Sequence, residues 1–312
     1  MNTTRTLAAA TAVLALAVGA TACGPADKPK APEAAAGSAA AAASSAPAAG
    51  RSPAAATPAA FLQKAGTKTG AAKSARVTES IKNGSTEITG KGSISWANGI
   101  LGTMTMQLPS AAAQKMGTDG AMDAVYGSDA MYINMHMPQA ALDQLGGKHW
   151  FKYAYADLSK VMGASGDVIK DGLKKADPVQ AVQTAIASGQ VTEVGKESVD
   201  GAPATHYAAE VTTAQLDGTQ GGALSADQLA GLRKQLESQG ISTTHYDVWV
   251  NDQDLLVKVR DTADTKNGPL DVTISYSDYG VQVQPTPPPA ADTADAAELI
   301  AKAKQSGQPA AS

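Results

Sequence analysis

Short segments in which apolar and polar residues alternate fill the middle of this chain. Between residues 76 and 108, three such segments are separated by the pairs Asn83-Gly84 and Asn98-Gly99. Asn-Gly is the strongest short-range signal for a hairpin, because both residues accept the positive φ angles of a tight turn. The pattern therefore predicts an antiparallel meander of three strands.

The alternation continues as far as residue 279. Further strands are predicted over residues 121–126, 130–136, 150–153, 190–199, 204–211, 244–251, 255–262 and 270–279. Helices are predicted over residues 61–73, 138–145, 156–162, 178–186 and 225–239. The proline-rich stretch at residues 285–289 is expected to end the sheet, and the acidic, alanine-rich remainder to form a marginal helix or a disordered tail.

These elements predict an α+β fold. An antiparallel sheet of about 11 strands curls instead of staying flat. Its concave face is apolar by the alternation and has to be covered, and the helices between the strands are the available cover. We therefore expect a curled antiparallel half-barrel with helices over its concave face.

The first 22 residues have the three parts of a secretory signal. Arg5 supplies the positive charge, and the apolar run that follows, residues 7–19, is too short to span a bilayer. The next residues, Ala20-Thr21-Ala22-Cys23, resemble a bacterial lipobox, with alanine at the −3 position where leucine is commonest. This resemblance implies an acylated Cys23, for example with palmitate, anchoring the protein to membrane lipid on the extracytoplasmic face. The alternative is a free or intermolecularly paired thiol in an ordinary secreted protein.

The composition divides the chain into four parts. Residues 1–22 are the predicted lipoprotein signal, and residues 23–60 are the lipidated cysteine with a disordered tether rich in alanine and proline. Residues 61–284 form one folded domain, and residues 285–312 form the tail. The net charge of −4 becomes more negative when the signal with Arg5 is removed. That acidity argues against binding to nucleic acid, and we expect a monomer.

No catalytic motif is present. The sequence lacks a phosphate-binding loop, a dinucleotide fingerprint, a zincin helix and a Gly-x-Ser-x-Gly elbow. Its four histidines are scattered without metal-ligand spacing: His136, His149, His206 and His245. We therefore expect no enzyme activity, no cofactor and no metal.

The order of the elements resembles a known group of lipoproteins. An anchored cysteine, a tether and a strand meander are followed by residues 200–207 (DGAPATHY), 246–250 (YDVWV) and 276–280 (YSDYG). The chain is similar in this to the actinobacterial lipoproteins of the LppX and LprG group, which have a LolA-like fold. The resemblance implies an apolar cavity that accepts the acyl chains of a lipid or lipoglycan, and it implies no catalytic residues.

Methionine is the unusual component of the predicted domain. All eight methionines of the mature chain lie between residues 104 and 162. They form either part of an ordinary core or a deformable cavity lining, since flexible thioethers suit promiscuous apolar surfaces. The candidate cavity residues are Ile100, Met104, Met106, Met131, Ile133, Met135, Val248, Val257 and Ile274.

Two other functions stay open at this point. Copper could bind through Met131, Met135, His136 and Met137, although strand alternation would place His136 on the opposite face from Met135 and Met137. The protein could also be a surface sensor or an interaction module without a ligand.

Overall fold

The computed structural model describes residues 57–144, 146–158, 179–188, 190–215, 226–266 and 268–305. The predicted signal, Cys23 and the tether as far as residue 56 lie outside these ranges. So do residues 159–162 of the helix predicted over residues 156–162.

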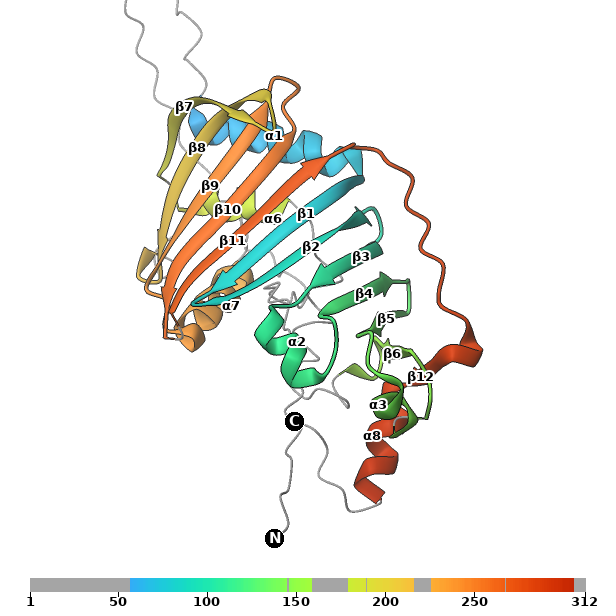
Figure 1. Ribbon diagram of the computed structural model, residues 1–312. Coiled ribbons are helices and arrows are strands. Elements are labelled where there is room, and N and C mark those ends of the chain that lie inside the picture. The colour runs from blue at the N-terminus through green and yellow to red at the C-terminus, as the bar shows by residue number, and fades with distance from the viewer. Residues whose placement is uncertain are drawn as a thin grey trace, which may run out of the picture.

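Twelve strands form one open sheet (Figure 1). The strands run in the spatial order β12-β6-β5-β4-β3-β2-β1-β11-β10-β9-β8-β7, and all neighbours are antiparallel except β12 and β6. Their bounds are β1 Ser74–Asn83, β2 Thr86–Ser95, β3 Leu101–Gln107, β4 Ala121–Tyr126, β5 Ala130–Asn134, β6 Trp150–Ala154, β7 Val191–Val199, β8 Ala202–Thr212, β9 Thr243–Asn251, β10 Leu256–Thr265, β11 Gly268–Ser277 and β12 Thr293–Asp295.

Three helices lie together on one face of the curled sheet, behind it in the view of Figure 1: α1 (Pro58–Ala72), α6 (Val179–Ala187) and α7 (Ala226–Gln239). We call this the inner face, and the opposite one the outer face. Among the described residues, the other helices are α2 (Ser110–Met116), α3 (Gln139–Gln144), α8 (Ala296–Gln305) and the 3₁₀ helix η2 (Ala290–Asp292). Helix α1 begins at a capping threonine, since the Thr57 hydroxyl accepts a hydrogen bond from the Ala60 N–H at 3.3 Å. Helix α7 ends at Gly240, whose φ of 73° is one that glycine adopts without strain.

The main core lies between these three helices and the strands β1 and β8–β11. Leu62 of α1, Val182 of α6 and Leu236 of α7 meet Val248 of β9 in one buried cluster. Burying each such side chain contributes about 2 kcal/mol, so the helices are held to this half of the sheet mainly by apolar packing.

The predicted fold class is confirmed. The sheet is curled and almost wholly antiparallel, and helices cover the part of its inner face formed by β1 and β8–β11. The three-strand meander and its turn at Asn83-Gly84 are present, with Asn83 paired to Thr86. The sheet has one strand more than predicted, because its end was placed too early: Thr293–Asp295 pairs in parallel with Trp150–Lys152. Helix α2, which follows Pro109, was not predicted.

The strand predicted over residues 255–262 is irregular at its start. A β-bulge lies between Leu256 and Lys258, where strand β10 pairs with β9. A bulge inserts one extra residue and so changes which side chains face inward. Leu256 is therefore fully buried in the main core, whereas Val257 lies in the bulge and is only half-buried.

Glycines on β2 allow larger inner-face residues to lie across them. A Cβ atom at Gly92 would lie 2.0 Å from the Thr103 carbonyl oxygen and 2.6 Å from the sulfur of Met104. At Gly90 the nearest atoms belong only to the Glu79 side chain, at 2.7 and 2.8 Å. Glu79 can rotate away, but the backbone of β3 cannot move without breaking its pairing with β2.

We expect Gly92→Ala to lower the free energy of unfolding by about 3 kcal/mol, as overpacking does. Gly90→Ala, the matched control on the same strand, should lower it by about 1 kcal/mol or less. Urea unfolding followed by circular dichroism measures both values. Equal losses in the two variants would contradict this account of the β2–β3 packing.

An acid with one buried carboxyl oxygen interrupts the inner face on β10. Asp261 is the register partner of Tyr246 on β9, and burial raises the pKa of its carboxyl from 3.8 to about 7, with a smaller contribution from Asp271. The folded protein therefore holds a proton on Asp261 between about pH 4 and pH 7 that the unfolded chain has lost. Stability must fall as the pH rises through this window.

Asp261→Asn should remove this loss of stability at rising pH, because asparagine does not titrate. We expect the variant and the wild type to be similarly stable near pH 4, and the variant to be more stable by about 2–4 kcal/mol above pH 8. Thermal unfolding across this pH range measures the difference, and Asp264→Asn, an exposed site on the same strand, is the control. A gap that is the same at every pH would rule out the raised pKa.

Candidate functional site

The inner face continues beyond the three helices onto β2–β5, where it is lined with methionine. The register carries the face across the sheet, since Val77 pairs with Gly92, and Gly92 pairs with Met104. The buried residues of this second cluster are Met104, Met106, Met122 and Ala124, and Ile88, Ile94, Tyr126, Ile133 and Met135 pack against them. We call this group the methionine cluster. No residue of the described helices belongs to it.

Direct pairing across the strands builds the cluster. Met106 of β3 lies opposite Met122 of β4, and Ala124 of β4 lies opposite Ile133 of β5. Side chains at such positions are about 5 Å apart at the Cβ atoms, so they form a continuous surface. Because thioether chains are unbranched and flexible, this surface can change shape at little cost.

The structure divides the predicted cavity residues between the two clusters. Met104, Met106, Ile133 and Met135 lie in the methionine cluster, and Met131 is buried next to them on β5. Val248, Ile274 and Ile100 belong instead to the main core beneath the helices. Val257 lies in the bulge of β10 and is in neither cluster.

Sequence reasoning missed the acids of the inner face as functional candidates. Glu79 shares the side of β1 that carries Val77 and Ile81, and Asp261 shares the side of β10 that carries Val259. The period-two pattern could have identified both acids, because residues two apart on a strand point to the same face. Burial raises the pKa of the Glu79 carboxyl. Burial also raises the pKa of the Tyr126 hydroxyl to about 12, and the charge of Glu79 adds a smaller increase.

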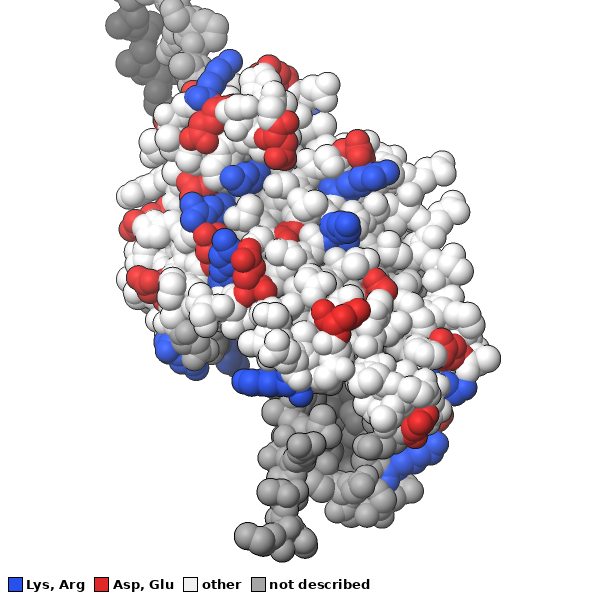
Figure 2. Space-filling model, in the orientation of Figure 1, with Lys and Arg blue, Asp and Glu red and all other residues white. Residues whose placement is uncertain are grey.

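Positive charge is confined to the outer face along most of the sheet. On strands β1–β6 and β8–β11, every lysine and arginine takes an outward position by the register: Arg76, Lys82, Lys91, Lys152, Lys258 and Arg260. Figure 2 shows these strands from the outer side, with basic and acidic side chains intermixed. Arg260 and Asp271 form one such pair, with 2.7 Å between their nearest atoms. The hydrogen bond from Arg260 holds the pKa of the Asp271 carboxyl below its usual value.

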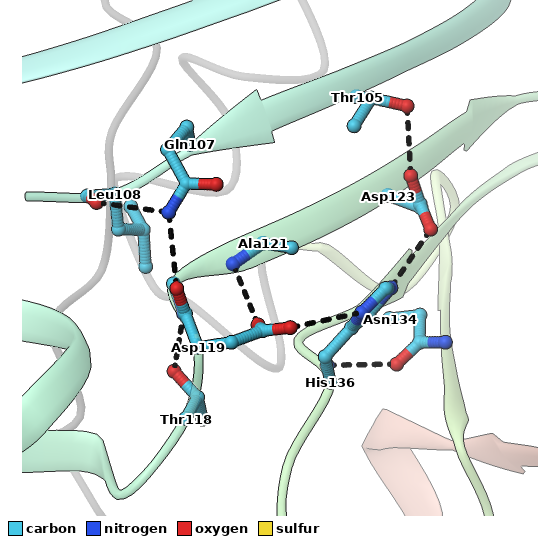
Figure 3. A network of polar contacts seen from close by, with 10 residues as sticks. Thr105, Gln107, Leu108, Thr118, Asp119, Ala121, Asp123, Asn134 and His136 are labelled. Atoms are coloured by element: carbon cyan, nitrogen blue, oxygen red, sulfur yellow. Dashed lines mark hydrogen bonds and ion pairs between the residues drawn. The ribbon is translucent and has the colours of Figure 1, made fainter.

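A polar network lies on the outer face over β3–β5 (Figure 3). The Thr105 hydroxyl donates to Asp123 Oδ1 at 2.8 Å, and the other oxygen of Asp123 contacts Nε2 of His136 at 2.8 Å. The carboxylate thus lies between the hydroxyl and the imidazole. A carboxylate is too weak a base to deprotonate an alcohol, and the imidazole does not contact the hydroxyl, so this order is not the hydroxyl–imidazole pair of an activated nucleophile. The network instead ties the end of β5 to β3 and β4.

On the outer face, His206 has a contact at each ring nitrogen and a stacking partner. Its Nδ1 contacts Glu197 at 2.9 Å, its Nε2 contacts Asp247 at 2.7 Å, and its ring stacks on Trp249 with 4.4 Å between centroids. Trp249 also donates its indole N–H to Glu197. The hydrogen bonds from Trp249 and His206 lower the pKa of the Glu197 carboxyl. Both ring nitrogens are occupied, so this arrangement braces β7, β8 and β9 against one another.

The residues proposed for copper lie in different surroundings. Met135 packs in the methionine cluster, His136 joins Asp123 on the outer face, and Met137 packs against Leu142 and Phe151. Within the described parts of the chain, no three His, Cys, Asp or Glu side chains are grouped to hold a metal ion. Nor is any helix there long and apolar enough to cross a membrane.

No family model matches the chain. Among solved structures, LprF of Mycobacterium bovis aligns with a TM-score of 0.45 and 14% identity over 74% of this chain and 96% of its own. LppX of Mycobacterium tuberculosis aligns with a TM-score of 0.41 and 13% identity over 73% and 98%.

Two Streptomyces proteins are much more similar in sequence. A 31.2 kDa protein from the rplA-rplJ intergenic region of Streptomyces griseus is 41% identical over 253 residues, which is 80% of this chain and 81% of that protein. "Putative lipoprotein SCO4650" of Streptomyces coelicolor is 35% identical over 245 residues, 77% of this chain and 75% of that protein. The resemblance to actinobacterial lipoproteins is thereby confirmed. The chain belongs to the family of Streptomyces proteins that includes these two relatives.

Proposed function

We propose that this protein is a lipid-anchored carrier that binds an amphiphile, and shuttles it, on the inner face of its sheet. The observation that carries the proposal is the methionine cluster, a deformable apolar surface on β3–β5 to which the described helices contribute no residue. Most ordinary cores are packed to a fixed shape by branched side chains. A surface built from Met104, Met106 and Met122 suits apolar chains of differing length.

The proposed anchor is Cys23, acylated after cleavage of residues 1–22. Two observations support this anchor: the lipobox-like sequence before Cys23, which is the single cysteine of the sequence, and the relative named as a lipoprotein. Two or three acyl chains hold a protein durably to a membrane, since each buried methylene contributes about 0.8 kcal/mol. The tether of residues 24–56 would let the folded domain stand away from the bilayer on its extracytoplasmic side.

Cys23→Ala should release the protein from the membrane fraction into the soluble extracytoplasmic fraction. Labelling with a palmitate analogue followed by ultracentrifugation measures both acylation and location. Thr21→Ser, which keeps the lipobox pattern, is the control and should remain labelled and membrane-bound. A wild-type protein that takes up no label would contradict the anchor.

Native mass spectrometry of the Cys23→Ala chain tests the carrier function. Protein purified from a lipid-rich actinobacterial host should carry bound lipid, and delipidated protein should take up monoacylglycerols of several chain lengths. The triple variant Met104→Leu, Met106→Leu, Met122→Leu keeps the volume of the lining, so we expect a stability loss below about 1.5 kcal/mol per site. Its stiffer side chains should narrow the range of chain lengths that bind.

Met137→Leu is the matched control, because this residue packs in a separate cluster with Leu142 and Phe151. It should leave the chain-length profile unchanged. If the wild type neither retains lipid nor binds any monoacylglycerol, the protein is not a carrier.

A further inference from the structure

Polar atoms without partners lie on the inner face of β9 and β10. Oδ1 of Asp261 and Oγ1 of Thr244 are buried and have no hydrogen-bond partner in the described structure. The Thr244 residue is only 1% exposed. Tyr246 follows Thr244 by two residues and pairs with Asp261, so the three side chains share one patch of the face. A buried polar group left unpaired costs about 1–3 kcal/mol, and native proteins rarely keep one.

A second carboxyl lies nearer the methionine cluster. Glu79 of β1 pairs with Ile274 of β11 on one side and with Gly90 of β2 on the other. Its side chain fills the space beside Gly90, where its Oε1 would lie 2.7 Å from an added Cβ atom. Neither Glu79 nor Asp261 has an ion pair with a described lysine, arginine or histidine. The inner face of β1–β6 and β8–β11 thus carries two acids and no lysine or arginine.

Building on the proposed carrier function, we infer that the inner face selects amphiphiles whose head group donates hydrogen bonds and bears no negative charge, with Asp261, Thr244 and Glu79 as its acceptors. Hydroxyl or ammonium donors would satisfy the oxygens that the chain leaves unpaired. A carboxylate or phosphate head group would bring a third negative charge to a face of low dielectric constant, on which the described strands β1–β6 and β8–β11 place no lysine or arginine.

The spacing of these residues suits a long apolar chain. Strands β10 and β3 are four neighbours apart in the sheet, which corresponds to roughly 19 Å along its surface at about 4.8 Å per strand. A head group at Asp261 therefore leaves its chain directed along the apolar face past Glu79 toward the methionine cluster. The two acids mark the head-group end of this path and its middle.

The test compares three amphiphiles with the same twelve-carbon chain: lauric acid, monolauroylglycerol and dodecylamine. Binding to the full chain carrying Cys23→Ala is measured by calorimetry at pH 8, below the micelle concentration of each compound. We expect lauric acid to bind about tenfold more weakly than monolauroylglycerol, or weaker still. Comparing dodecylamine with monolauroylglycerol distinguishes hydrogen bonds donated by an ammonium group from those donated by hydroxyl groups.

The double variant Glu79→Gln, Asp261→Asn should bring lauric acid to within about threefold of monolauroylglycerol, because it removes both charges and keeps the shape. Asp264→Asn, on the outer side of β10, should keep the wild-type discrimination. Equal binding of all three compounds to the wild type would overturn the head-group inference and leave the carrier function standing. A double variant that still binds lauric acid about tenfold more weakly than monolauroylglycerol would have the same consequence. If none of the three binds, the carrier function fails and this inference fails with it.

Discussion

The structure depends on one geometric constraint, the alternation of side chains across a curled antiparallel sheet. Successive residues of a strand point to opposite faces, so one slip of register would exchange the faces completely. Here the pairing runs without a shift from β1 through β5 and from β1 to β10 through β11. Val77, Gly92 and Met104 therefore share a face with the main core, while Arg76 and Lys91 point away from it.

The two halves of the inner face differ in what fixes their shape. Beneath α1, α6 and α7, branched residues such as Leu62, Val182 and Val248 pack together in one buried cluster. On β3–β5 the surface consists of methionine, alanine and isoleucine, set against glycines on β2. A rigid half and an adaptable half within one sheet suit a protein that must stay folded while the occupant of one region changes.

Local signals in the sequence predicted most of the fold, and non-local ones were missed. The Asn83-Gly84 turn and the period-two runs depend on neighbouring residues alone, so they could be predicted. The bulge at Leu256–Lys258 depends on the partner strand β9. Strand β12 depends on β6, about 140 residues earlier in the chain, and three residues after a run of prolines carry no pattern of their own. For the site, the methionines were found by their density, whereas Glu79 and Asp261 were passed over because acids are ordinarily assigned to solvent.

Half-buried acids on an apolar face, such as Glu79 and Asp261, are hard to explain by folding alone. Asparagine or glutamine would have nearly the same shape without the cost of desolvating a charge, and leucine would add apolar packing. The outer face shows how this chain treats acids that serve structure: Asp271 is paired with Arg260, and Asp247 with His206. Asp261 has no such partner among the described residues, because Arg260 and Thr262 beside it on the strand face the other way. A carboxyl oxygen that has no partner among the described residues and lies on an apolar face is the feature that the proposed head-group contact would explain.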